Sequence, residues 1–300
     1  MTHEHLTNGV FPAMTTPFAD DGCIDHEQLA ADARRLEAAG VDGVVPVGST
    51  GESATLTHDE HIEVVETVVE ARESVPVIAG SGSNSTHEAV SLSRRSAEAG
   101  ADALLLISPY YNKPEPSGME AHYRRVADEV DIPQVLYNVP SRTGRNIAVE
   151  TTVNLASHEN VVGYKAASGD LGRISEVAER TADEDFSVMS GDDALTLPVI
   201  SVGGTGVISV GANVEPERYS ELVWSALEGD YDRAREVHRE LSPLFRALFA
   251  ETNPIPVNAA MEIRGYGPGN VRSPLSELAP EHRDRLEAVL SDLEESEATV

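Results

Sequence analysis

Short runs of apolar, β-favouring residues recur along the chain about every 25–30 residues. Between them lie polar, alanine-rich segments with the spacing of amphipathic helices, such as HEQLAADARRLEAAG (26–40) and THEAVSLSRRSAEAG (86–100). Both segments end in glycine where a helix C-cap would lie. The apolar runs are VFPAMTT (10–16), GVVPVGS (43–49), VPVIAGS (75–81), ALLLISP (103–109), PQVLYNV (133–139), VVGYKAA (161–167), FSVMSGD (186–192) and TGVISVG (205–211).

This alternation predicts an α/β fold. Eight strands that are apolar on both faces and alternate with helices indicate a closed parallel (β/α)8 barrel, or TIM barrel. The competing architecture, a doubly wound open sheet, would carry a glycine-rich dinucleotide motif after its first strand, and PAMTTPFADDG (12–22) is not such a motif. The last part of the chain is helical in pattern. We therefore expect a catalytic barrel over residues 1–225 and a C-terminal helical region over 226–300.

The charge of the chain narrows the possible partners. There are 51 acidic and 22 basic residues, so the formal net charge is −29. Such a dispersed excess suits concentrated salt, where self-repulsion is screened, and indicates a halophilic source. We expect no nucleic-acid or anionic membrane partner. Cys23 is the single cysteine and no apolar run is long enough to span a bilayer, so we expect a cytoplasmic protein.

Lysine is nearly absent from the chain. Only Lys113 and Lys165 accompany 20 arginines. A lysine in an apolar pocket can lose its proton and become a nucleophile, whereas arginine stays charged. Lys165 follows the apolar run VVGY, so it is either a nucleophile or a structural lysine at a strand end. Lys113 lies in a proline-flanked loop, and we assign it no role.

Reactive groups gather where the predicted strands end, which is the face of a barrel that carries active sites. Ser49 and Thr50 lie between glycines and can present N–H groups to a carboxylate, or form an ordinary turn. Tyr137 can relay protons to a neighbouring amine, or be a buried core tyrosine. Arg142 can clamp a carboxylate, or be a loop charge.

Seven motifs, taken in order, give the chain a family resemblance. They are GSTGESATL, SPYYNKP, LYNVPSRTG, GYKAASG, SGDD, GVISV and NPIPV. Residues 8–264 thus resemble the dihydrodipicolinate synthase branch of the N-acetylneuraminate lyase family of class I aldolase-like enzymes. The resemblance implies a TIM barrel with a C-terminal helical region, assembled as a homotetramer, a dimer of dimers.

The resemblance also implies a lyase of the diaminopimelate route to lysine. In that family the lysine matched by Lys165 forms a Schiff base with pyruvate, whose enamine attacks L-aspartate 4-semialdehyde to give 4-hydroxy-tetrahydrodipicolinate. No metal or organic cofactor is expected, because the imine is the electron sink. Tyr137 matches the proton-transferring tyrosine. Thr50 links it to a second tyrosine, matched by Tyr111, which enters from the neighbouring subunit. One departure is AAS (166–168), where many relatives have a Glu and a Thr.

The same resemblance supplies the substrate-binding residues. Ser49 and Thr50 match the pair that holds the pyruvate carboxylate. Arg142 matches the residue that grips the carboxylate of the semialdehyde. Gly191 and Ile208 match backbone positions that line the pyruvate pocket.

A second set of polar residues follows the GES motif. His58 and His61 are spaced i, i+3 on one helical face, so with Glu88 and a third group they could bind zinc, or they could be solvated. In inhibited members of the family the corresponding positions bind L-lysine as a feedback inhibitor at the dimer interface. The full set implied is Ser53, Ala54, His58, His61, Asn84, Glu88 and Tyr110.

Two other functions remain open. An aldolase for 2-keto-3-deoxygluconate or its 6-phosphate would use the same lysine and tyrosine, and Arg142 in SRTG favours the synthase over it. A non-catalytic barrel that only senses pyruvate or lysine would lack at least one catalytic group, and this sequence lacks none.

Overall fold

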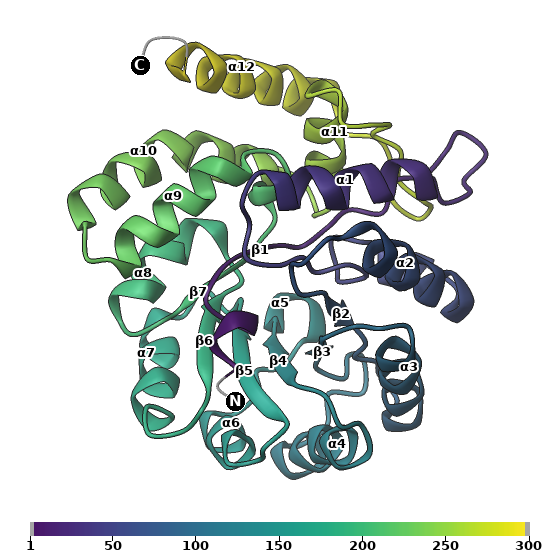
Figure 1. Cartoon of the computed structure of the whole chain (residues 1–300), viewed down its shortest axis with the longest axis vertical. Coiled ribbons are helices and arrows are strands. Elements are labelled where there is room, and N and C mark those ends of the chain that lie inside the picture. The colour runs from purple at the N-terminus through teal and green to yellow at the C-terminus, as the bar shows by residue number, and fades with distance from the viewer. Residues whose placement is uncertain (1–2, 298–300) are drawn as a thin grey trace.

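A curved sheet of seven parallel strands lies inside a ring of helices (Figure 1). The computed structural model describes residues 3–297. Neighbouring strands follow the order β1-β7-β6-β5-β4-β3-β2. Their bounds are Gly9–Pro12 (β1), Ile78–Gly80 (β2), Ala103–Ile107 (β3), Gln134–Asn138 (β4), Val161–Ala166 (β5), Ser187–Ser190 (β6) and Gly206–Ser209 (β7).

Residues 43–47 close this sheet into a barrel. Val45 pairs in parallel with Ala13 just after β1, and Val44 pairs with Val77 just before β2. This segment is the eighth strand that the sequence predicts. The predicted (β/α)8 fold with a C-terminal helical extension is therefore confirmed.

The closing strand is shorter than its apolar run, GVVPVGS (43–49), suggests. Pro46 has no N–H with which to continue a ladder, and Val47 has a φ of 50°, in the left-handed region. The backbone therefore leaves the sheet here and turns into the polar GSTGES segment at the carboxyl end of the barrel.

Helices follow the strands as the hydrophobic spacing predicts. Gly40 and Gly100 have φ values of 81° and 94° just beyond α1 and α3, which confirms them as helix-terminating glycines. The helices are α1 His26–Ala38, α2 His58–Ala71, α3 Thr86–Glu98, α4 Pro116–Glu129, α5 Pro140–Thr143, α6 Val149–Ala156, α7 Leu171–Arg180, α8 Thr196–Ser201, α9 Pro216–Leu227, α10 Tyr231–Leu248, α11 Ile255–Ile263 and α12 Pro280–Glu297, with short 3-10 turns η1 Glu4–Leu6, η2 Ser53–Thr55, η3 Asp193–Leu195 and η4 Gly211–Asn213.

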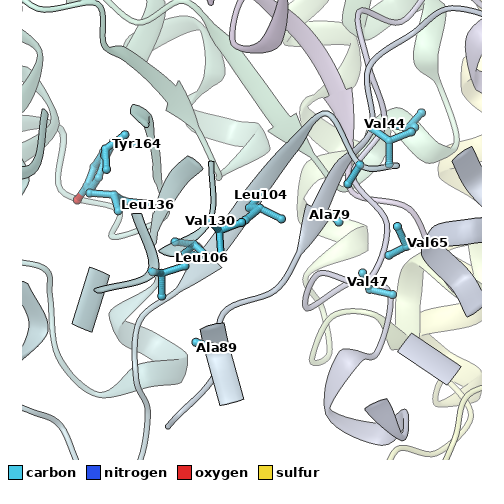
Figure 2. Close-up of a cluster of buried hydrophobic side chains, with 14 of the residues drawn as sticks. Val44, Val47, Val65, Ala79, Ala89, Leu104, Leu106, Val130, Leu136 and Tyr164 are labelled. Carbon is cyan, nitrogen blue, oxygen red and sulfur yellow. The ribbon is translucent and has the colours of Figure 1, made fainter. Parts of the chain in front are cut away.

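Alternate strand residues face two different cores, because side chains along a strand point to opposite faces. Leu104 and Leu106 of β3, with Leu136 and Tyr164 on the next strands, belong to the core between sheet and helices (Figure 2). A second cluster fills the barrel and takes residues from every strand. It includes Phe11, Val45, Ile78, Leu105, Val135, Tyr137, Val162, Met189 and Ile208. Because Tyr164 faces outward, its neighbour Lys165 faces the interior.

The C-terminal helices α10, α11 and α12 lie together on one side of the barrel (Figure 1). They share a hydrophobic cluster with α9 and with Val10 and Val207 of the barrel strands. Helix α9 crosses residue 225, and the predicted domain boundary at that residue stays a prediction. No helix within residues 3–297 combines the length and apolar character that a membrane span needs.

Candidate active site

Most of the predicted site residues meet at the carboxyl end of the barrel. The register pairs Tyr137 of β4 with Lys165 of β5, and Lys165 with Met189 of β6. Ser49 and Thr50 follow the closing strand, Arg142 lies on the one-turn helix α5 after β4, Gly191 follows β6, and Ile208 lies on β7. Parallel strands thus bring together residues that are far apart in sequence.

Lys165 is buried, with 5% of its surface exposed. Burial lowers its pKa from 10.5 to about 7, because the ammonium is poorly solvated there. The Asp193 carboxylate opposes this shift, whereas the Arg142 guanidinium adds to it. The Nζ atom lies 4.3 Å from the centre of the Tyr137 ring. A large fraction of free amine is therefore available near neutral pH, beside a phenol that can carry protons.

Tyr137 is also buried, and burial raises the pKa of its phenol. Arg142 and a hydrogen bond with the Ser49 side chain oppose this shift. The phenol is therefore neutral at physiological pH, and its proton can be donated and recovered.

Gly191 makes room for the lysine side chain. A Cβ at this position would lie 2.9 Å from both Cγ and Cε of Lys165 and 3.0 Å from Cβ of Ala167. These separations are shorter than carbon–carbon contacts allow, so only glycine fits without displacing the lysine.

A buried asparagine joins two of the predicted substrate-binding residues. Asn253 Nδ2 donates to Thr50 Oγ1 at 3.0 Å, and the Asn253 carbonyl accepts a hydrogen bond from Arg142 at 2.6 Å. Sequence reasoning gave Asn253 no role, although NPIPV is one of the motifs of the resemblance. The contact with Thr50 spans 203 residues, so no local spacing reveals it.

Arg142 forms no ion pair with the part of the chain that the structure describes. No carboxylate among residues 3–297 lies within ion-pair distance of it, whereas Arg145, three residues further on, pairs with Glu115 at 2.8 Å. An uncompensated guanidinium at the barrel mouth can bind a substrate carboxylate.

Asp193 is a second residue that sequence reasoning left without a role. It is buried, its Oδ2 accepts the N–H of Gly211 at 2.9 Å, and burial raises its pKa. The SGDD motif contains it, but the sequence alone does not show that it is the carboxylate whose charge favours the protonated form of Lys165.

Tyr111 does not reach the other site residues within one chain. Tyr111 is 86% exposed, and its φ of 65° lies in the left-handed region. The adjacent Tyr110 is 42% exposed. Both tyrosines lie in the loop between β3 and α4.

A cavity of about 530 Å3 lies beside the site. Its walls include six of the seven residues predicted to bind L-lysine, together with Ser49, Arg142 and Asn253. The six are Ser53, Ala54, His58, His61, Glu88 and Tyr110. The seventh, Asn84, is not part of the wall, and its buried Oδ1 has no hydrogen-bond partner among residues 3–297.

Four of the cavity residues already have partners within the chain. Glu88 pairs with His58 Nε2 at 3.0 Å and accepts a hydrogen bond from Ser83. His61 Nε2 donates to the Gly80 carbonyl at 2.7 Å, and burial lowers its pKa to about 4. His61 therefore stays neutral and ties α2 to β2. Among residues 3–297 no group of three His, Cys, Asp or Glu side chains is placed to hold a metal ion.

A (β/α)8 barrel that holds a buried amine at the carboxyl end of its strands has the features of an enzyme that uses a lysine as its nucleophile. Residues 6–293 match the dihydrodipicolinate synthetase family. The 4-hydroxy-tetrahydrodipicolinate synthase of Natronomonas pharaonis is 70% identical over 98% of this chain and 100% of that protein. That of Haloarcula marismortui is 68% identical over 96% of this chain and 94% of that protein.

A solved structure agrees with these sequences. Dihydrodipicolinate synthase from Cyanidioschyzon merolae with lysine bound has a TM-score of 0.94 and 38% identity, over 97% of this chain and 99% of that one. The chain belongs to the dihydrodipicolinate synthetase family. The predicted family and the predicted class of enzyme, a lyase, are confirmed.

Proposed function

We propose that the chain condenses pyruvate with L-aspartate 4-semialdehyde through a Schiff base on Lys165. The observation that carries this proposal is the buried amine, whose pKa falls to about 7 beside the Tyr137 ring. At pH 7.4 such a lysine is about 70% free amine, against about 0.1% for a lysine with its ordinary pKa. The names of relatives that are 68% and 70% identical support the same reaction.

The reaction begins when the Lys165 amine adds to the keto carbon of pyruvate. Water then leaves and an iminium forms, with Tyr137 moving protons to and from the oxygen. Loss of a methyl proton gives an enamine, whose carbon attacks the aldehyde of the second substrate. The amino group of that substrate then displaces Lys165 and closes the ring. No external oxidant or reductant is needed.

Both substrates carry a carboxylate, and the remaining residues bind these groups. Ser49 and Thr50 hold the pyruvate carboxylate, while the backbone at Gly191 and Ile208 lines its pocket. Arg142 binds the carboxylate of the semialdehyde. At about 1 M salt the Debye length is about 3 Å, so the net charge of the chain no longer repels the substrates, whereas contacts with Arg142 survive. The setting we propose is the cytosol of a halophile.

Reductive trapping tests this proposal. Purified protein is incubated with pyruvate and cyanoborohydride in molar salt, and the modified residue is mapped by mass. Lys113, the other lysine, is the internal control and should stay unmodified. The Lys165→Arg variant should trap nothing and have no activity. Trapping at Lys113, or normal turnover by K165R, would refute the mechanism.

Substrate assays separate the synthase from its nearest rival. Turnover with pyruvate and L-aspartate 4-semialdehyde should greatly exceed cleavage of 2-keto-3-deoxygluconate or its 6-phosphate. The opposite preference would assign the site to a sugar-acid aldolase. Trapping without turnover of any of these substrates would favour the effector-binding barrel.

We propose further that L-lysine inhibits the enzyme from the cavity of about 530 Å3 beside the site. In the cavity wall, Glu88 offers a carboxylate to an ammonium group and Tyr110 offers a hydroxyl to a carboxylate. Asn84 lies outside the wall, and its proposed role rests on the family resemblance. The lysine-bound relative supports this assignment. Saturating L-lysine should lower the activity of the parent and leave Glu88→Gln much less affected. Flat activity in L-lysine would refute the idea, and activity lost to chelators would favour a zinc site.

We also propose that a second copy of the chain supplies Tyr111 to this site, within a homotetramer. The 86% exposure of Tyr111 in the single chain is the supporting observation. Lys165→Arg and Tyr111→Ala, each nearly inactive alone, should regain activity when unfolded and refolded together, because mixed dimers contain one intact site. Failure to regain activity, in assemblies shown by sedimentation to be mixed, would exclude the shared site.

A further inference from the structure

Asn253 lies in the short connection between α10 and α11, and this connection crosses the carboxyl end of the barrel. The residue is 8% exposed. The connection contacts two strand ends at once, at Thr50 after the closing strand and at Arg142 after β4. The C-terminal helical region thereby reaches the substrate-binding residues of the barrel.

The side chain of Asn253 is dedicated to one partner. Its Nδ2 donates to Thr50 Oγ1 at 3.0 Å, and its buried Oδ1 has no hydrogen-bond partner among residues 3–297. An amide N–H can only donate, so the Thr50 oxygen accepts at this contact. The Thr50 hydroxyl keeps its own proton free to donate to a substrate carboxylate or to the Tyr137 oxygen.

The backbone of Asn253 holds the second partner. Its carbonyl accepts from the Arg142 guanidinium at 2.6 Å. A carbonyl oxygen fixes the guanidinium without neutralising it, whereas a carboxylate at this place would cancel the charge that an anionic substrate needs.

We infer that Asn253 is a positioning residue, which sets the direction of the Thr50 hydrogen bond and orients Arg142 toward the substrate. This inference rests on the proposed function. It assigns the two tasks to different parts of one residue, so substitution of the side chain should disturb Thr50 and leave Arg142 in place.

The test compares Asn253 with a matched neighbour. Asn258, on α11, is 2% exposed and its Nδ2 donates to the Pro254 carbonyl at 3.1 Å, so it stabilises the same connection without touching Thr50 or Arg142. Asn253→Ala should lower kcat about 10- to 100-fold, because loss of an oriented contact misplaces the proton donor. The isosteric Asn253→Asp should lose more, because a carboxylate accepts the Thr50 proton. N258A and N258D should retain kcat per folded molecule.

Two readouts separate positioning from general loss of structure. The KM for the semialdehyde should change less than threefold in N253A, because the backbone carbonyl that holds Arg142 remains. In a Thr50→Val background, N253A should cost almost nothing further, because the two changes break one link. Normal kcat in N253A, losses equal to those of N258A, or additive losses with T50V would overturn the inference. Failure of the proposed function is distinguishable, because the unaltered enzyme would then trap no pyruvate.

Discussion

A methyl group added at Gly191 tests the position of the Lys165 amine. The added Cβ of Gly191→Ala would lie 2.9 Å from Cγ and Cε of the lysine. Carbon atoms prefer separations of about 3.5–4.0 Å, so the lysine side chain must move by about 0.6 Å or more. A displacement of about 1 Å from a reacting geometry costs about 100-fold in rate. We therefore expect pyruvate trapping at Lys165 to slow by about 10- to 100-fold.

The assay is the rate of reductive trapping at a fixed pyruvate concentration, followed by intact mass. Gly172→Ala is the matched control, since its new Cβ would come no closer than 3.4 Å to Asp170 on the exposed start of α7. This control should trap at the parent rate, and alanine in a helix should slightly stabilise the fold. Overpacking at Gly191 should cost about 1–3 kcal/mol of stability, which thermal unfolding measures separately.

An unchanged trapping rate in a folded G191A variant would refute this reasoning. It would mean that the amine reacts from another position, or that the strand end opens readily enough to admit a side chain. A slow rate shared by G172A would point to a general defect instead.

Three further outcomes are expected. Because the pKa of Lys165 is about 7, trapping should fall as the pH drops through 7 and level off above about 8, whereas an ordinary lysine would keep gaining rate to about pH 10. Arg142→Gln should raise the KM for the semialdehyde at least tenfold, because the second carboxylate loses its partner. It should slow pyruvate trapping only near neutral pH, because loss of the guanidinium raises the pKa of Lys165. Burial lowers the pKa of His122 from 6.5 to about 4, so the unfolded chain binds a proton first below pH 6.5. The contribution of neutral His122 to the free energy of unfolding is therefore present above pH 6.5 and declines by about 1.4 kcal/mol per pH unit as the pH falls toward 4. Denaturant titrations at pH 6.5 and pH 5 should show a smaller decline in the free energy of unfolding for His122→Leu than for the parent.

Much of the barrel follows from local patterns. Apolar runs locate all eight strands. VVGYKA is apolar on both faces, however, so the run does not show that Tyr164 faces the helices and Lys165 the interior. The extent of a strand is less predictable. Pro46 and Val47 look like strand residues in GVVPVGS, yet the ring of the first and the positive φ of the second end the ladder.

Contacts between distant segments set the limit on prediction from sequence. The bond from Asn253 to Thr50 spans 203 residues, and no periodicity links them. The effect of the Asp193 charge on the pKa of Lys165 likewise depends on two strand ends that pack together although they are apart in the sequence. For Tyr111 a single chain is not enough, because its predicted partner residues belong to a second copy.

The two basic residues of the site, Lys165 and Arg142, keep their function in an acidic chain by different physical means. Burial removes water from around Lys165 and lowers its pKa, so that the neutral amine is well populated near pH 7. The buried Asp193 carboxylate opposes this shift. Arg142 is exposed, and in a chain with 51 acidic residues it would be expected to find a carboxylate, as Arg145 does. The guanidinium instead donates a hydrogen bond to the Asn253 carbonyl. A neutral acceptor leaves the charge available at contact range, where molar salt screens little. The acidic surface and the anion-binding site are therefore compatible, because one acts over long distances and the other at contact.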